Sequence, residues 1–126
     1  MALPWVRLDT GFPMNPKVLA LVEDKKWQSI TVYVAGLAYS GQQGTDGFLP
    51  TASLVFMHGT KRNATDLVDV GLWAPRQGGY EIHDWTDYQQ TSDEHEARRK
   101  RAQAAAEVRW HGTPEPIRKA GSRNAR

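Results

Sequence analysis

The sequence predicts a mainly helical α+β domain, and three observations lead to that class. Apolar residues recur at helical spacing in several segments, which indicates amphipathic helices. Phe48 and Leu49 form a brief apolar pair after an Asp46-Gly47 turn signal, which indicates a short strand. Two strand-like runs near residue 80 flank a segment rich in proline and glycine, which is typical of a β-hairpin.

Two short helices are predicted between that strand and the hairpin. Pro50 and the apolar run after it open the first helix, which Gly59 closes. Thr60 can cap a second helix over residues 61 to 70, and Gly71 stands where a helix takes its C-terminal glycine. Its predicted buried face consists of Ala64, Leu67, Val68 and Leu72.

The hairpin is predicted from residues 72 to 74 and 80 to 85, with residues 75 to 79 as its tip. Helix, turn, helix and hairpin in this order predict a winged helix-turn-helix in which residues 61 to 70 form the second helix. The predicted boundaries are 1–88 for this domain, 91–111 for a basic helix and 112–126 for a disordered basic tail. Thr91-Ser92-Asp93-Glu94 is a capping-box pattern that predicts the start of the basic helix.

The segments before the motif add an arm and two helices. Residues 5 to 9 read as a short strand or an extended arm, and Asn15-Pro16 is an N-cap followed by proline that starts a helix over residues 16 to 24. Residues 27 to 40 are predicted as the longest core helix. Its expected buried face is Trp27, Ile30, Val34, Leu37 and Ala38. Trp5, Trp27, Trp73 and Trp85 are expected in core and hairpin packing.

Charge divides the chain unevenly. Residues 1 to 96 hold seven Lys and Arg against twelve Asp and Glu, and residues 97 to 126 hold nine against two. The folded part is therefore acidic and the C-terminal part basic. The chain has no cysteine and no apolar run long enough to span a bilayer, so we expect a soluble, cytoplasmic protein without a disulfide framework.

At the level of residues, the chain resembles the N-terminal winged-helix domain of bacteriophage replisome organisers, the DnaD-like replication initiation proteins of actinobacteriophages. The segments that carry the resemblance are Trp5-Val6-Arg7-Leu8-Asp9, Asn15-Pro16-Lys17, Thr45-Asp46-Gly47-Phe48-Leu49-Pro50, Val70-Gly71-Leu72-Trp73, Gly79-Tyr80-Glu81-Ile82-His83-Asp84-Trp85 and the helix ending in Arg109-Trp110. The resemblance implies DNA binding in phage replication initiation, without catalysis or a cofactor. It also implies a replicative helicase, its loader or another host protein as a partner, and it is compatible with a homodimer.

Candidate DNA contacts lie in three places. In a helix-turn-helix the start of the second helix reaches base edges, and arginine and asparagine suit guanine and adenine while lysine suits phosphate. The wing tip can touch the DNA backbone, and the basic cluster after residue 97 can neutralise several phosphates. The candidate residues are Lys61, Arg62, Asn63 and Thr65 on the helix, Arg76 and Gln77 on the wing, and Arg98, Arg99, Lys100, Arg101 and Arg109 in the basic helix.

Two other classes of function stay open. Asp66 and Asp69 are expected on the exposed side of the second helix, where they would repel phosphate, so a winged helix that binds a protein is the alternative; a phage transcriptional regulator is a nearby third. The four histidines lack the spacing of a metal site. His83-Asp84 is not expected to act as an acid/base pair, because neighbours on a strand point to opposite faces.

Overall fold

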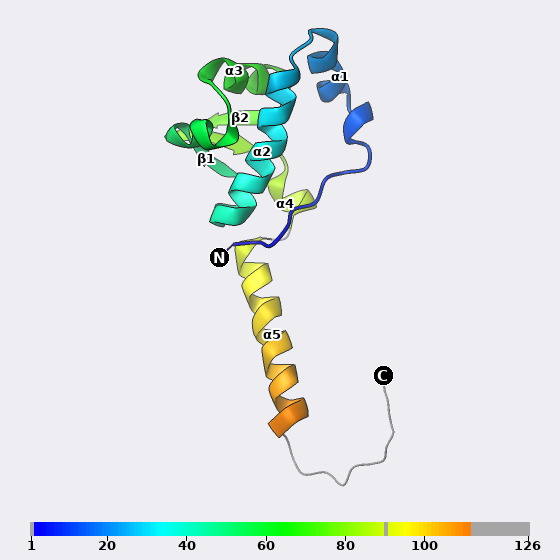
Figure 1. Ribbon diagram of the computed structural model, residues 1–126, viewed down its shortest axis with the longest axis vertical. Coiled ribbons are helices and arrows are strands. Elements are labelled where there is room, and N and C mark those ends of the chain that lie inside the picture. The colour runs from blue at the N-terminus through cyan, green and yellow to red at the C-terminus, as the bar shows by residue number, and fades with distance from the viewer. Residues whose placement is uncertain (1, 90, 112–126) are drawn as a thin grey trace. The chain divides into compact units, whose positions relative to one another are not determined.

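The computed structural model of the chain describes residues 2–89 and 91–111 (Figure 1). The elements are, in chain order, the 3₁₀ helix η1 (Phe12–Met14), α1 (Pro16–Glu23), α2 (Trp27–Gln43), β1 (Phe48–Pro50), the 3₁₀ helix η2 (Thr51–Met57), α3 (Lys61–Val70), β2 (Trp73–Arg76), β3 (Gly79–Ile82), α4 (Trp85–Tyr88) and α5 (Ser92–His111). The chain divides into two units, Met1–His95 and Glu96–Arg126, with the boundary inside α5. The predicted disordered tail, residues 112–126, lies outside the described residues.

A small antiparallel sheet joins β1 to the hairpin formed by β2 and β3, so the predicted mainly helical α+β class is confirmed. The strand order is β1-β3-β2, and β3 therefore pairs with both neighbours. Leu49 lies opposite Tyr80 in one pair, and Trp73 lies opposite Ile82 in the other. A side chain at Gly79 would collide with the backbone at Leu49, so the close approach of β1 and β3 requires glycine there.

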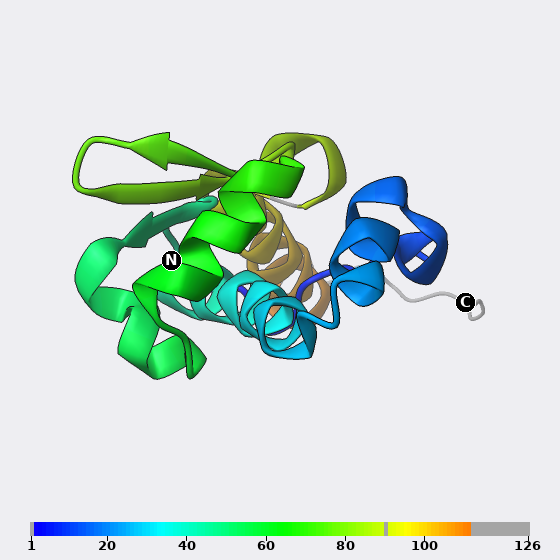
Figure 2. The ribbon, with the colours of Figure 1, turned by 90° about the horizontal axis from the view of Figure 1, so that it is seen from above.

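The core lies where α2 and α3 pack together and against the sheet. Ala64 and Leu67 of α3 are fully buried, and Leu72 just after the helix is also buried, as predicted; Val68 is only half-buried. Asn15 caps α1, since its side chain accepts a hydrogen bond from the backbone of Lys17. Figure 2 shows α3 passing between α2 and the hairpin.

The predicted buried face of α2 is wrong for three of its five residues. Trp27 is 57% exposed, Val34 is 42% exposed and Ala38 is exposed; Ile30 is half-buried and Leu37 is buried. The inner face is instead built from Ser29, Val32, Gly36, Leu37 and Ser40. Small residues let neighbouring elements approach closely, and the serines bond across to other segments. A search for apolar periodicity alone misses such residues.

The N-terminal arm is extended and is not part of the sheet. The Leu3 amide donates to the carbonyl of Gly41 at 2.7 Å. The Gln89 side chain holds Arg7 from both sides, because its oxygen accepts from the Arg7 amide at 2.8 Å and its nitrogen donates to the Arg7 carbonyl at 2.7 Å. Trp5 is 64% exposed, so its expected place in the core is wrong, whereas Trp73 and Trp85 are buried as expected.

The turn between the two helices of the predicted motif differs in detail. The first helix is the 3₁₀ helix η2, and His58 takes the left-handed conformation with a φ of 63°. Gly59 follows that turn, and a Cβ there would approach Val32 to 2.8 Å. Gly59 therefore allows the turn to pack on α2, while His58 ends the helix.

Both ends of the hairpin also differ from the prediction. The strands continue to Arg76 and begin again at Gly79, so the tip is Gln77-Gly78. Asp84 is left-handed, with a φ of 59°, and this reversal starts α4 where the prediction continued the strand to Trp85. The predicted capping box at the start of α5 is confirmed, since Thr91 and Glu94 exchange side-chain to backbone hydrogen bonds of 2.9 and 3.1 Å. None of the described helices combines the length and the apolar character that crossing a membrane requires.

Candidate nucleic-acid interface

The start of α3 is held by its own side chains. The Thr60 hydroxyl accepts a hydrogen bond from the backbone N–H of Asn63 at 3.4 Å. In return, the side-chain oxygen of Asn63 accepts one from the backbone N–H of Thr60 at 2.9 Å. This reciprocal cap satisfies two backbone donors that a helix start otherwise leaves unpaired. The first turn of α3 is therefore well defined before any ligand binds.

Asn63 has to be removed from the predicted DNA-reading residues. Its side chain is buried, with 6% of the residue exposed, and its Nδ2 donates to the Ser29 hydroxyl at 3.1 Å. Both functional groups of the amide are thus committed to the cap and to α2. An asparagine in this position cannot reach an adenine edge without breaking the helix cap.

Asp66 also faces inward, which corrects the prediction that it lies beside Asp69 on the exposed side. Its carboxylate accepts from Lys26 Nζ at 3.0 Å and from the Ser29 hydroxyl at 2.8 Å, and its side chain is 12% exposed. Burial alone would raise the pKa of Asp66, but the hydrogen bonds from Lys26 and Ser29 and the nearby positive charges outweigh it and lower the pKa. The expected repulsion of phosphate by Asp66 is therefore largely cancelled by Lys26.

Three of the predicted residues share the exposed side of α3. Lys61, Arg62 and Thr65 are exposed, and so is Asp69 two turns further on. The Thr65 hydroxyl donates to the Lys61 carbonyl at 3.0 Å, which fixes its rotamer on the outer surface. Two cations in the first turn of a capped helix form a surface suited to a polyanion.

The residues of the predicted wing, Arg76 and Gln77, lie at the far end of the hairpin. Arg76 pairs with Glu81 across the two strands at 2.7 Å, and its guanidinium lies 5.7 Å from the centre of the Phe48 ring. Both partners are about half exposed, so the pair is open to competition by a phosphate. Gln77 is exposed at the tip, next to Gly78 with its φ of 86°.

The predicted DNA-binding residues of α5 belong to the second unit. Arg99 pairs with Glu96 at 2.9 Å and Lys100 approaches the same carboxylate at 3.8 Å. The hydrogen bond from Arg99 is the main reason that the pKa of Glu96 is lowered. At about 100° per residue, Arg98, Arg101 and Arg109 fall within one stripe of the helix. All three are exposed.

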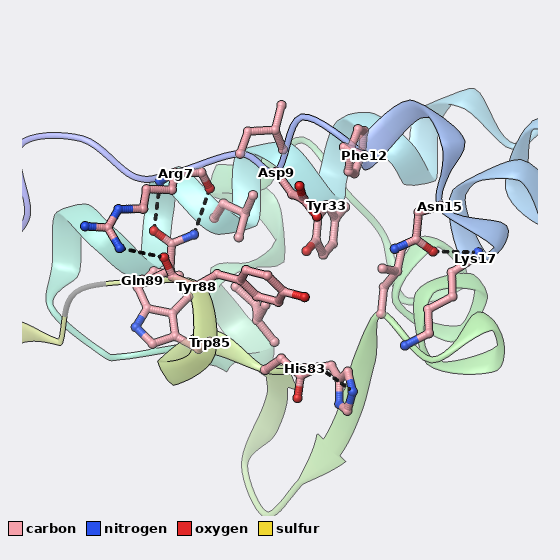
Figure 3. Close-up of a pocket in the computed structure, with 15 residues that line it drawn as sticks. Arg7, Asp9, Phe12, Asn15, Lys17, Tyr33, His83, Trp85, Tyr88 and Gln89 are labelled. Atoms are coloured by element: carbon pink, nitrogen blue, oxygen red, sulfur yellow. Dashed lines mark hydrogen bonds and ion pairs between the residues drawn. The ribbon is translucent and has the colours of Figure 1, made fainter.

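A polar pocket that the sequence did not predict lies under the N-terminal arm (Figure 3). Its volume is about 100 Å³, and its lining includes the hydroxyl-bearing rings of Tyr33 and Tyr88. Burial raises the pKa of Tyr33, and nearby Tyr88 and Asp84 add to the effect. The residues come from segments as far apart as positions 7 and 89. No pattern of neighbouring residues in the sequence indicates that these segments come together.

His83 and Asp84 do touch, which corrects the prediction that they point apart. His83 Nε2 lies 2.9 Å from the Asp84 carboxylate, and both side chains are about half exposed. The strand ends at Ile82, so the alternation of a strand does not apply to the two residues after it.

In comparisons with known proteins, no family model, no curated protein and no solved structure matches this chain. The choice of site residues therefore depends on the geometry of the chain itself. Sequence reasoning missed Lys26 and Ser29, which orient α3 from the side of α2. They lie 40 and 37 residues from Asp66, so no spacing within a helix connects them.

Proposed function

We propose that residues 2–89 form a winged helix-turn-helix that binds duplex DNA. Support comes from the order of α2, β1, η2, α3 and the hairpin, and from the pairing of β1 with β3 beside the hairpin. A tight turn at His58-Gly59 joins η2 to α3, as in helix-turn-helix motifs. In this proposal α3 enters the major groove and the Gln77-Gly78 tip is the wing.

One observation carries the proposal. Lys61 and Arg62 are exposed in the first turn of α3, while the nearest acid, Asp66, is turned inward and paired with Lys26. The outer surface of that turn is therefore positive within an otherwise acidic unit. We assign Arg62 to a base edge, Lys61 and Thr65 to phosphate, and Arg76, Gln77 and the α5 arginines to flanking backbone contacts.

A role in phage replication initiation is the biological setting that we propose. It rests on the resemblance of residues 5 to 111 to replisome organisers, in which a helicase or its loader is the protein partner. A cytoplasmic location follows from the same proposal.

A competition assay tests the DNA-reading helix. A preferred duplex is first selected from a random pool, and binding is then compared on that duplex and on a scrambled one. Arg62→Ala is expected to cost about 1–3 kcal/mol on the preferred duplex and much less on the scrambled one, while Lys61→Ala weakens both alike. Equal losses on both duplexes for Arg62→Ala would contradict base reading by α3.

The second candidate function is a protein-binding winged helix, and one observation favours it. Val55 and Phe56 of η2 are 67% and 69% exposed, which places large apolar side chains next to the turn that leads into α3. Apolar side chains that lie together on a surface mark sites of protein contact. If no duplex binds in the selection, the protein-binding candidate replaces DNA binding.

A further inference from the structure

The outer face of α2 is a stripe without a charged residue, and three of its five members are apolar. Trp27, Thr31, Val34, Ala38 and Gln42 follow one another at intervals of three or four residues, so they line one side of the helix. All five are exposed. The stripe has the periodicity of a packed helix face, yet nothing in residues 2–89 covers it.

A hollow lies at the C-terminal end of the stripe. It is lined by Ala35, Ala38, Tyr39, Gln42, Gln43 and Phe56, with a volume of about 450 Å³. The ring of Tyr39 stacks on that of Phe56, with centroids 6.4 Å apart and planes 4° apart. The stacked rings form one side of the hollow, and the small side chains of Ala35 and Ala38 form its base.

Trp27 lies at one end of the stripe, and two of the residues that line the hollow, Ala38 and Gln42, lie toward its other end. The α2 residues of the hollow that share the stripe come 11 and 15 residues after Trp27, which is about 16 to 22 Å along the axis. Turning a copy of α2 about a two-fold axis near Val34 reverses its direction. The operation brings Trp27 of one copy to the level of residue 41 in the other, next to Ala38 and Gln42.

We propose that two copies of this chain associate through their α2 outer faces, antiparallel, with each Trp27 filling the hollow of the other copy. A two-fold interface uses the same patch on both partners, so the patch must carry both the projecting group and its receptor. This face carries both. Thr31 and Ala38 lie on either side of the axis, and side chains of their size allow helix axes to approach to about 8–10 Å.

The exposed area also fits a pair of copies. A whole aromatic side chain offers about 150–250 Å², so the exposed parts of Trp27 and Phe56 amount to roughly 250 Å² per copy. With Val34 and the smaller members of the stripe, two copies would bury about 1,000 Å², where specific interfaces begin. The absence of charge on the stripe argues against DNA as its occupant.

Sedimentation of the full chain without DNA tests the proposal, because failure of self-association then leaves DNA binding untouched. The chain is expected to show a monomer–dimer equilibrium, and Trp27→Glu is expected to weaken it by on the order of 30-fold or more. Trp5→Glu is the matched control, since Trp5 is 64% exposed on the arm. A chain that stays monomeric, or equal dimerisation by the wild type and Trp27→Glu, would overturn the proposal.

A cysteine probe checks the geometry by an independent route. The chain has no cysteine, so Val34→Cys introduces a single thiol next to the proposed axis. Mild oxidation is expected to yield disulfide-linked dimers of Val34→Cys, and much less of Leu19→Cys, whose residue is 47% exposed on α1. Equal cross-linking of the two variants would show that the pairs form by random collision and would contradict the antiparallel arrangement.

Discussion

The two helices that carry proposed DNA contacts, α3 and α5, obtain their exposed charges in different ways. α3 is packed on the core, and its packing decides which polar residues face outward: Asn63 and Asp66 bond to Ser29 and Lys26 on the inner side. From Glu96 to Arg109, α5 has no buried residue, and its ion pairs join neighbours along the same helix. The surface of α3 is a result of tertiary structure, whereas that of α5 follows from residue spacing alone.

Because of this difference, substitutions at the proposed DNA contacts are expected to act differently in the two helices. A side chain on α3 can contribute to binding, to stability or to both, because the helix is part of the core. A side chain on α5 is expected to contribute to binding alone. Substitutions in the two helices should therefore separate stability from affinity.

The largest difference is expected for apolar truncations. Leu67→Ala removes a side chain with 0% exposure and is expected to lower the free energy of unfolding by about 2–5 kcal/mol. Val108→Ala in α5 removes a side chain that is 71% exposed, and it is expected to change stability by less than about 0.5 kcal/mol. Urea unfolding measures both variants. Similar losses for the two would contradict the packing described for α3.

Asp66, the acidic residue of α3 that faces inward, is expected to stabilise the fold. Asp66→Asn is expected to cost about 1–3 kcal/mol at neutral pH, because it removes charge-assisted hydrogen bonds from Lys26 and Ser29. Asp69→Asn is the matched control, since Asp69 is exposed on the same helix.

The loss should depend on pH with a definite sign. The pKa of Asp66 is lower in the folded state than its ordinary value of 3.8, so its stabilisation is complete above that value and disappears as the pH falls through the folded pKa. The difference in stability between the wild type and Asp66→Asn should therefore shrink below about pH 4. A difference that stays constant down to about pH 2 would rule out the charged pair as its source.

Asn63 of α3 is expected to contribute to stability and not to base preference. Asn63→Ala is expected to destabilise the fold by about 1–2 kcal/mol, because it removes part of the cap and leaves Ser29 without one of its partners. The base preference should stay as in the wild type, in contrast to Arg62→Ala. A changed preference on selected and scrambled duplexes would return Asn63 to the DNA-reading set.

The smallest effect on stability is expected from the arginine stripe of α5. Arg98→Gln combined with Arg101→Gln should leave the unfolding free energy of residues 2–89 within about 0.5 kcal/mol. The salt slope of DNA binding should fall by about one unit for each phosphate that the variant no longer neutralises. An unchanged slope would remove these two residues from the DNA-binding surface.

The features that sequence predicted correctly are those decided by neighbours in the chain. Caps at Asn15 and Thr60, the left-handed Gly71 and the box at Thr91 each depend on residues within three or four positions. The exposed positions of Lys61, Arg62 and Thr65 followed from the period of α3.

The features that sequence did not predict depend on distant partners. Ser29 draws Asn63 and Asp66 inward across more than 30 residues, and no local pattern marks a serine as part of a core. The outer face of α2 is predicted to be buried because Trp27, Val34 and Ala38 have the period of a core face. If two copies pair through that face, the period describes a contact between chains instead of one within the chain.

Affinity for a random duplex at two salt concentrations is the most direct test of whether this chain binds DNA through its basic side chains. If Lys61, Arg76 and one α5 arginine each neutralise a phosphate, affinity should fall roughly 40-fold between about 50 and 200 mM salt, from a slope of about −0.9 per contact. Lys61→Ala should flatten the slope by about one unit. Absence of binding at the lower salt concentration, or binding that does not change with salt, would contradict the account of this chain as a DNA-binding protein.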